Sequence, residues 1–417
     1  MITLIEALNF RCLRYIRQPL GPLHVLVGPN GSGKTAFLDV TAFLSRLVRG
    51  GLEAALYERT HNVRDLVWGR SEGHFELALE AGIPEDRRSQ LANKDCDTIR
   101  YEISLGIDPR TTRAAILSER VLLKAPRPLP ETSPQRDLFP LPAEPPTSIM
   151  APKVAKGART VVNKLGDGHD NFYDETAKGW DHAFQLGPQR SALANLPEDE
   201  SKFPASTWLK RFLAEGVQQM VLNSISMRKA SPPGQTRGFQ PDGSNLPWVV
   251  AALEKDAPAR FQDWIASLRT ALPDLESIRT VEREDDLHRY LVLRYGSGVE
   301  TPSWVAPDGA LRLLALTLPA YLPGFEGIYL IEEPENGIHP LAVEAMFRTL
   351  SSVCKAQILM ATHSPVLLRL AQPGQLLCFA RTPEGATDIV LGSEHPALKD
   401  PSRQSTLAEL FSGGVLG

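Results

Sequence analysis

The sequence predicts an α/β protein built around a phosphate-binding loop, and three observations lead to this prediction. An apolar run over residues 23–27 leads through a glycine-rich turn into a helical pattern over residues 34–48. Two further apolar runs, over residues 327–331 and 357–361, each end in charged or polar residues. Buried strands that alternate with helices are typical of a sheet whose strand ends carry the functional side chains.

The composition is that of an ordinary globular protein. The chain has 417 residues, 42% of them hydrophobic and 23% charged, with a formal net charge of -4. This length suggests roughly two or three domains and excludes disorder for most of the chain. The near-neutral balance excludes a polybasic protein, so any nucleic-acid contact would come from a local patch of Lys and Arg.

Cysteine spacing and hydropathy bear on the compartment. The four cysteines lie far apart and form no C-x-x-C pair, which argues against a disulfide framework or a zinc site: Cys12, Cys96, Cys354 and Cys378. The N-terminus lacks a signal-peptide pattern, and no run of about 18 apolar residues occurs. We therefore expect a cytoplasmic protein with reduced thiols and no membrane anchor.

The pattern along the chain suggests four segments. Residues 1–125 read as a strand-rich N-terminal lobe with one strong helix, because apolar residues alternate near residues 75–79 and 101–105. In residues 126–152, nine of the 27 residues are proline, which favours an extended linker.

The other two segments differ in pattern. Residues 153–275 show helical spacing near 208–221, 247–255 and 259–272, so we expect a mainly helical inserted arm or lid. No heptad repeat is sustained, so a long coiled coil is not expected. Residues 276–417 alternate strands and helices and predict a C-terminal α/β lobe.

The most specific motif is Gly28-Pro-Asn-Gly-Ser-Gly-Lys34-Thr35, which fits G-x-x-x-x-G-K-[ST] and lies between a strand and a helix. Glycines let backbone N–H groups curl around phosphate oxygens, and the helix N-terminus adds its positive dipole end. Lys34 would reach the β and γ phosphates of ATP, and the Thr35 hydroxyl would bind Mg²⁺. The predicted nucleotide-binding residues of the loop are Asn30, Gly31, Ser32, Gly33, Lys34 and Thr35.

Two other strand ends supply the remaining chemistry. The apolar run before Glu332 and Glu333 provides the carboxylate that a P-loop requires for Mg²⁺, which we assign to Glu332. Glu333 would orient and deprotonate the attacking water. His363 follows the strand at 357–361, where its imidazole could hydrogen-bond a γ-phosphate oxygen.

Together, G-P-N-G-S-G-K-T, I-E-E-P-E-N-G-I-H-P and A-T-H-S-P resemble the ABC-type ATPases of the RecF/SMC/OLD branch, in particular bacterial AAA-type predicted ATPases related to OLD nucleases. The resemblance covers about residues 1–50 and 300–370. It implies an ABC-type ATPase head, and it places Arg11, which follows Asn9-Phe10, near the nucleotide phosphates. It also implies a homodimer with ATP at the interface.

In that family a signature helix from one subunit caps the γ-phosphate held by the other. Pro307-Asp308-Gly309-Ala310-Leu-Arg312 is similar to the family's S-D-G-T-L-R, which assigns Asp308 and Gly309 to the partner's nucleotide. Pro307 and Ala310 replace the family's hydroxyl residues, so a hydroxyl contact is missing. Residues 336–340 correspond to the family's D-loop at the dimer interface.

The resemblance also bears on the process. OLD nucleases carry a Toprim domain after the ATPase, and only 54 residues follow His363, so we expect any nuclease or toxin effector on a separate chain. The resemblance implies anti-phage defence or DNA transactions, with nucleic acid as a possible partner. Two alternatives stay open: an ATP-gated binding module with little turnover, and the nucleotide-binding subunit of a membrane transporter.

Overall fold

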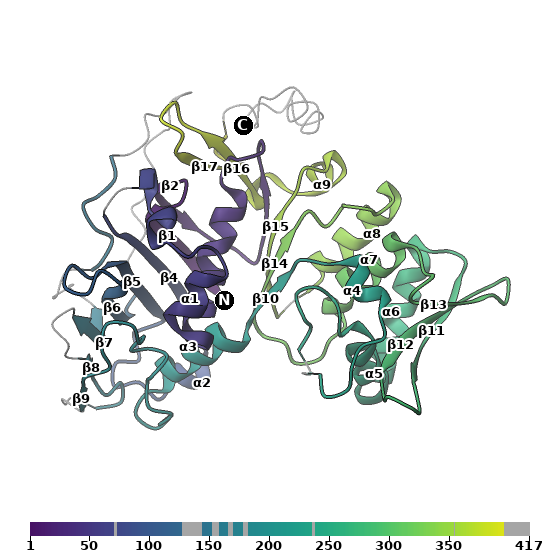
Figure 1. The fold of residues 1–417 in the computed structure, drawn as a ribbon, viewed down its shortest axis with the longest axis horizontal. Coiled ribbons are helices and arrows are strands. Elements are labelled where there is room, and N and C mark those ends of the chain that lie inside the picture. Colours follow the sequence, from purple (N-terminus) through teal and green to yellow (C-terminus); the bar gives the residue numbers. More distant parts are fainter. Residues whose placement is uncertain are drawn as a thin grey trace.

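The computed structural model describes residues 1–70, 73–126, 144–151, 158–165, 170–177, 182–235, 238–353 and 355–395. Two lobes lie side by side in Figure 1, with a six-stranded sheet running between them. In the described part of the chain, no helix is both long and apolar enough to cross a membrane.

The N-terminal lobe is built on an eight-stranded antiparallel sheet in the order β2-β1-β4-β5-β6-β7-β8-β9. The bounds of these strands are β1 Ile2–Phe10, β2 Leu13–Pro19, β4 Phe75–Gly82, β5 Thr98–Ile107, β6 Ala114–Lys124, β7 Ala158–Leu165, β8 Asp170–Phe172 and β9 His182–Phe184. The alternation that predicted strands near residues 75–79 and 101–105 reflects this sheet, since successive side chains point to opposite faces.

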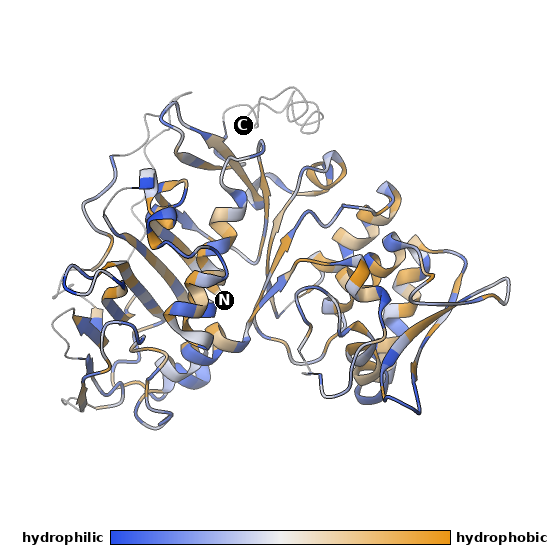
Figure 2. Ribbon diagram, viewed as in Figure 1, coloured by the Kyte–Doolittle hydropathy of each residue, from blue (hydrophilic) through white to orange (hydrophobic). Residues whose placement is uncertain are grey.

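One face of this sheet packs on two helices. Helix α1 (Lys34–Tyr57) and helix α3 (Pro204–Glu215) contact each other and cover the face that carries Leu77, Tyr101 and Ile103. Figure 2 shows apolar residues along these strands where the helices cover them. Helix α1 changes direction at Gly51, whose φ of 84° breaks the regular helix.

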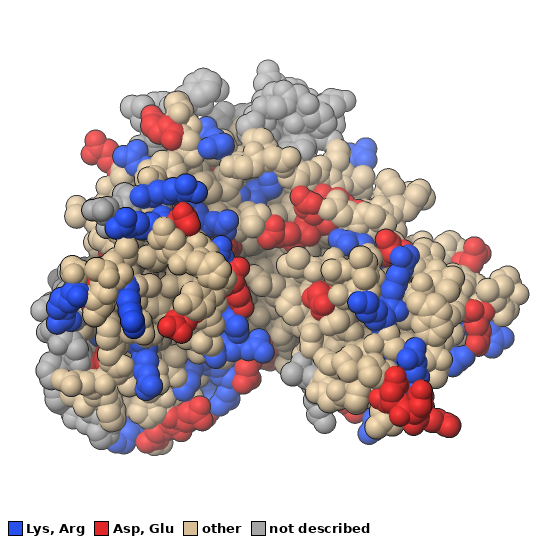
Figure 3. Space-filling model, viewed as in Figure 1, with Lys and Arg blue, Asp and Glu red and all other residues tan. Residues whose placement is uncertain are grey.

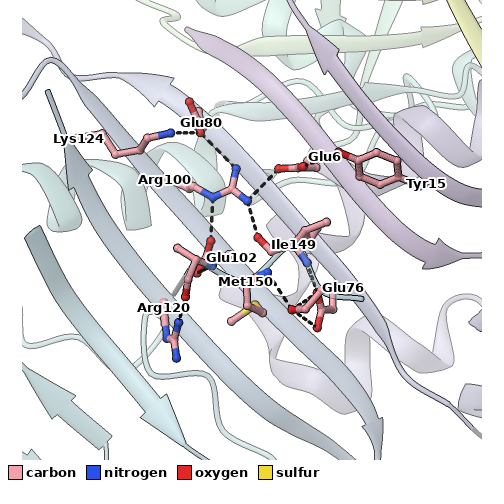
Figure 4. Close-up of polar contacts among 12 residues, drawn as sticks. Glu6, Tyr15, Glu76, Glu80, Arg100, Glu102, Arg120, Lys124, Ile149 and Met150 are labelled. Carbon is pink, nitrogen blue, oxygen red and sulfur yellow. Dashed lines mark hydrogen bonds and ion pairs between the residues drawn. The ribbon is translucent and has the colours of Figure 1, made fainter. Parts of the chain in front are cut away.

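The opposite face of the sheet is polar but partly buried, because residues 148–151 lie across it (Figure 4). Glu76 accepts hydrogen bonds from the Ser148 hydroxyl (2.9 Å) and the Ile149 N–H (2.7 Å). Glu102 accepts from the Ala151 N–H at 2.7 Å. The predicted linker over 126–152 therefore ends in a segment fixed to the sheet; residues 127–143 and 152 lie outside the described residues.

The central sheet has the order β10-β14-β15-β3-β16-β17 and is parallel except for β17. Its strands are β3 Leu23–Val27, β10 Val217–Met220, β14 Ile328–Glu332, β15 Gln357–Ala361, β16 Leu376–Arg381 and β17 Thr387–Leu391. The P-loop strand β3 pairs with β15 and β16, not with the N-terminal sheet. The two predicted lobes therefore share this sheet, and a boundary at residue 125 does not separate them.

The second lobe places helices beside a small antiparallel sheet. The helices are α4 Ser224–Arg228, α5 Leu246–Asp256, α6 Pro258–Ala271, α7 Asp308–Thr317, α8 Pro340–Ser351 and α9 Pro365–Leu370, and the sheet contains β11 Leu275–Glu282, β12 Arg289–Tyr295 and β13 Glu300–Pro302. Helix α6 packs on α7 and α8, so its apolar face is part of the second core. A short helix α2 (Glu85–Arg88) lies in the first lobe and contacts α3.

Residues 153–275 therefore do not form one inserted helical arm, although helices α3, α5 and α6 lie in or overlap the ranges where helical spacing was expected. Strands β7 to β9 extend the N-terminal sheet, and β10 pairs in parallel with β14. Residues 217–220 were expected to continue a helix, but Gly216 ends α3, and the segment satisfies its backbone in the central sheet instead. The helices α5 and α6 match the expected ranges but pack into the second lobe.

Candidate nucleotide-binding site

The P-loop connects β3 to α1, and its backbone requires glycine. Gly28, Gly31 and Gly33 have φ values of 149°, 77° and 105°, in the region that side chains disfavour. A Cβ at Gly33 would overlap with the Thr387 hydroxyl, and one at Gly28 would overlap with the Phe379 carbonyl. The loop is therefore a backbone cradle whose following helix N-terminus favours an anion.

Lys34 and Thr35 occupy the first turn of α1. The Lys34 ammonium donates hydrogen bonds to the carbonyl oxygens of Gly28 (2.7 Å) and Pro29 (3.0 Å), which holds it across the loop. Burial lowers the pKa of Lys34, and the nearby Glu333 and Glu332 carboxylates oppose that shift. The Thr35 hydroxyl donates to Glu332 Oε2 at 2.7 Å, so both predicted magnesium ligands meet at one point.

Glu333 and His363 lie at neighbouring strand ends, because β14 and β15 are parallel and adjacent. Glu333 has a φ of 46°, and its N–H donates to the Ala361 carbonyl at 2.8 Å, so this backbone leaves the strand direction sharply. Burial and the Lys34 charge lower the pKa of His363, against the effect of Glu333 and Glu335. The imidazole is therefore mostly uncharged at neutral pH.

One cavity of about 360 Å³ brings these groups together, lined by Arg11, Cys12, Asn30, Gly31, Gly33, Lys34, Thr35, Ala36, Glu332, Glu333, Ala361 and His363. Nearly all of the residues predicted for one protomer's site line it. Ser32 does not, because its side chain is fully buried and its carbonyl accepts from Thr387 at 2.8 Å. The cavity combines the glycine cradle, a lysine, a hydroxyl–carboxylate pair and a second carboxylate, which fits a nucleotide triphosphate with Mg²⁺.

Arg11 lies at the edge of this cavity, as the resemblance implied, but it is held by a partner that the sequence did not reveal. Its guanidinium pairs with Asp39 at 3.0 Å, and Asp39 also pairs with Arg59 at 2.5 Å. The Arg59 side chain is 12% exposed, whereas that of Arg11 is 40% exposed. Arg59 thus balances the charge of Asp39. The more exposed Arg11 lines a second cavity of about 620 Å³, together with Thr35 and Glu332, and contributes a positive charge there.

Asp308 and Gly309 lie away from the cavity of their own chain, at the N-terminus of α7. The Asp308 carboxylate pairs with Arg228 at 2.7 Å. A Cβ at Gly309 would lie 2.6 Å from the Gly337 carbonyl oxygen, so the signature helix begins directly against the predicted D-loop. This position is compatible with the predicted action on a partner's nucleotide, which stays a prediction.

Sequence reasoning missed the roles of four polar or charged residues that shape the site. Asp39 could have been suspected, because it lies four residues after Thr35 and so on the same face of α1. Glu335 and Asn336 hold His363 and Glu333, but only their place after the strand-end acids hinted at this. No local pattern connects Arg59 to the site.

The fold and this site define a P-loop ATPase head of the ABC type. Residues 158–369 match the family described as "AAA domain, putative AbiEii toxin, Type IV TA system". The match covers more than half of the chain, so the chain belongs to that family.

One curated relative agrees with this class. The chain is 55% identical over 371 residues to the OLD nuclease of Thermus scotoductus (strain ATCC 700910 / SA-01), across 88% of this chain and 59% of that nuclease. The chain therefore spans little more than half the length of that relative.

Two solved structures share the fold. An Smc head bound to the C-winged helix domain of ScpA aligns with a TM-score of 0.56 at 13% identity, covering 93% of this chain and 97% of that one. The Smc head with an extended coiled coil, bound to the C-terminal domain of ScpA derived from Pyrococcus furiosus, aligns with a TM-score of 0.52 at 12% identity, covering 93% and 95%. At this identity the likeness shows the fold alone.

Proposed function

We propose that this chain binds ATP with Mg²⁺ in the 360 Å³ cavity and hydrolyses it to ADP and phosphate. The observation that supports this best is the 2.7 Å hydrogen bond from the Thr35 hydroxyl to Glu332, in a cavity that also holds Glu333 and His363. A P-loop alone would support binding only. A carboxylate beside the expected metal ligands supports activation of water as well.

Each side chain has a distinct task in this proposal. The P-loop N–H groups and Lys34 bind the phosphates. Thr35 and Glu332 would hold Mg²⁺, which when bound would supply positive charge to neutralise the phosphates. Asn336 donates to Glu333 Oε2 at 2.5 Å and so orients that carboxylate. Glu333 takes a proton from the attacking water. The water oxygen then forms a bond to the γ-phosphorus, and the bond between that phosphorus and the β–γ bridging oxygen breaks.

The proposed active form is a head-to-tail homodimer in which the Gly309 helix of each protomer caps the partner's ATP. In its favour, Asp308 and Gly309 do not line the cavity of their own chain. Exposed apolar side chains also lie near this helix: Ile225 on α4, Val305 just before α7 and Leu341 at the start of α8 are 67%, 64% and 75% exposed. Such side chains are suited to an interface that forms with nucleotide.

Substitution of Lys34 tests the assignment. Lys34→Ala removes the ammonium that would neutralise the phosphates, so we expect ATP affinity to fall at least about tenfold and turnover to disappear. Thermal melting should stay near that of the wild type, because the hydrogen bonds of the ammonium within the described residues go to carbonyls of its own loop. Glu333→Gln is the matched variant that should keep ATP binding and lose turnover. Unchanged ATP affinity in Lys34→Ala would refute the site.

An ATP-gated binding module is the second candidate, favoured by Pro307 and Ala310 in the signature. Ala310 is buried and Pro307 caps α7 without a hydroxyl, so two contacts that would stabilise the transition state are absent. In this case ATP binding holds an assembly and hydrolysis is slow. Glu333→Gln separates the two functions: retained biological activity without turnover supports the binding module, and lost activity supports the ATPase.

For the process, we propose anti-phage defence or a DNA transaction in the cytoplasm, with a separately encoded nuclease or toxin as effector. The nuclease named among the relatives and the toxin system in the family description support this proposal. Nucleic acid is a further proposed partner, since Arg14, Arg17 and Arg49 are exposed on the N-terminal lobe, where Figure 3 shows many basic side chains. Affinity capture of the effector, and DNA binding that weakens steeply with salt, are the tests.

A further inference from the structure

The loop from Glu333 to Ile338 touches three parts of the proposed site. Its first residue is the proposed base, and Asn336 bonds that base at 2.5 Å. Its Gly337 carbonyl faces the start of the signature helix at Gly309. Between them, Glu335 reaches back across the parallel strand pair to the end of β15. Glu335 has no role in the proposed mechanism, although one oxygen of its carboxylate accepts two hydrogen bonds.

Glu335 uses one oxygen for two bonds. Its Oε1 accepts from the Thr362 hydroxyl at 2.7 Å and from the His363 N–H at 2.8 Å. Thr362 is fully buried, and its hydroxyl in turn accepts from the Ser364 N–H at 2.9 Å. These three hydrogen bonds set the backbone direction on both sides of His363. The imidazole enters the nucleotide cavity from this fixed backbone.

The second oxygen, Oε2, is closed off from solvent and, within the described residues, receives no hydrogen bond. A carboxylate that acted through its charge would be expected to have a cation or several donors around it when buried. The arrangement at Glu335 instead uses the reach of the side chain and one acceptor atom. A shorter side chain would not span the distance, whereas an amide of the same length would.

We propose that Glu335 is a positioning residue that fixes His363 for the γ-phosphate through Oε1, and that its reach matters more for turnover than its charge. This inference rests on the proposed ATPase function. The loop also connects three parts of the site: it bonds the proposed base through Asn336, bonds the backbone of His363 through Glu335, and lies against the start of the signature helix at Gly337.

A matched pair of variants separates reach from charge. Glu335→Gln keeps the length and one acceptor oxygen and removes the charge, and a neutral amide costs less to bury than a carboxylate. Glu335→Asp keeps the charge and loses one methylene of reach. We expect the kcat of Glu335→Gln to stay within about threefold of the wild type and that of Glu335→Asp to fall about tenfold. ATP affinity should stay within about threefold of the wild type in both variants.

A double-mutant cycle with His363→Ala tests whether Glu335 acts through His363. In the His363→Ala background, Glu335→Asp should cause little further loss, because the group that it positions is already absent. Thermal melting of each variant reports whether the fold is retained. Thr362→Val removes the hydroxyl that donates to Glu335 Oε1 and accepts from the Ser364 N–H, and so provides an independent partial loss of the same contact.

Three results would overturn the inference. Glu335→Gln could lose as much turnover as Glu335→Asp or more, which would mean that turnover depends on the charge of Glu335. The losses of Glu335→Asp and His363→Ala could multiply, which would place the two residues in separate roles. Glu335→Asp could also turn over normally. A failure of the proposed ATPase function looks different, because then the wild type itself shows no turnover that depends on Lys34.

Discussion

Arg100 lies at the centre of the buried charge network on the outer face of the N-terminal sheet (Figure 4). Its guanidinium pairs with Glu102 at 2.8 Å, Glu6 at 2.9 Å and Glu80 at 3.2 Å, and also donates to the Ile149 carbonyl at 2.9 Å. The Arg100 side chain is 8% exposed and that of Glu102 is fully buried. We predict that Arg100→Leu destabilises this lobe strongly.

The size of the effect follows from the charges left behind. Leucine replaces the stem of the arginine but leaves buried carboxylates without their shared cation, and breaking a buried pair in this way costs about 3–5 kcal/mol. Glu80 retains Lys124 at 2.5 Å, so most of the cost comes from Glu6 and Glu102. Arg279→Leu is the matched control: its pair with Glu300 is 49% and 45% exposed, and such pairs contribute less than about 1 kcal/mol.

The dependence on pH gives a second measure. Burial acts to raise the pKa of Glu80, but Lys124 and Arg100 outweigh burial and lower it. A lowered folded pKa contributes stability above about pH 4.3, the ordinary value for glutamate, and this contribution is lost as pH falls through the folded pKa. Lys124 lowers the Glu80 pKa in both proteins and Arg100 only in the wild type, so the gap in unfolding free energy between the wild type and Arg100→Leu should narrow by the Arg100 part of this shift as pH falls below about 4.3.

Urea unfolding at pH 7 and pH 4, with hydrogen exchange of residues 144–151, measures both effects. We expect faster exchange at the Ile149 and Ala151 N–H groups in Arg100→Leu, since the segment loses its bond to Arg100. A loss of less than about 1 kcal/mol at pH 7, equal to the Arg279→Leu control, would refute the view that these buried carboxylates depend on Arg100.

Three further predictions concern the nucleotide site. Thr35→Val removes the hydroxyl that bonds Glu332 at 2.7 Å, so the Mg²⁺ concentration for half-maximal turnover should rise about tenfold or more, and an unchanged Mg²⁺ dependence would contradict the metal assignment. His363→Ala should lower kcat about tenfold at unchanged ATP affinity. Because burial lowers the pKa of His363, the wild type should also lose more stability than this variant as pH falls below about 6.5, and parallel curves of stability against pH would contradict the lowered pKa. Pro307→Glu adds an exposed acid at the start of α7 without the overlap expected at Gly309. If sites form between protomers, mixing this variant with Lys34→Ala should restore about a quarter of wild-type ATPase activity, whereas normal turnover by Pro307→Glu alone would contradict that arrangement.

The place of the predicted site residues in the fold could be predicted from the sequence because each motif is local. The P-loop, the Glu332–Glu333 pair and His363 each follow an apolar strand directly, and chain order alone places these residues at strand ends. The α/β fold, confirmed by the structure and the Smc head likeness, follows from the same local patterns. Helices α5 and α6 were predicted closely, because their apolar spacing is repeated over several turns.

The arrangement of these parts was decided only by tertiary structure. Strand β3 lies between β15 and β16, and β10 is a strand beside β14, since parallel pairing joins segments over a hundred residues apart and leaves no local signal. The same holds for side chains and loops: Glu335 bonds the backbone of His363, and Gly309 lies against Gly337, across elements that are far apart in the sequence. A sequence pattern states which face of an element is buried, but contacts between distant elements depend on packing, which only the folded chain specifies.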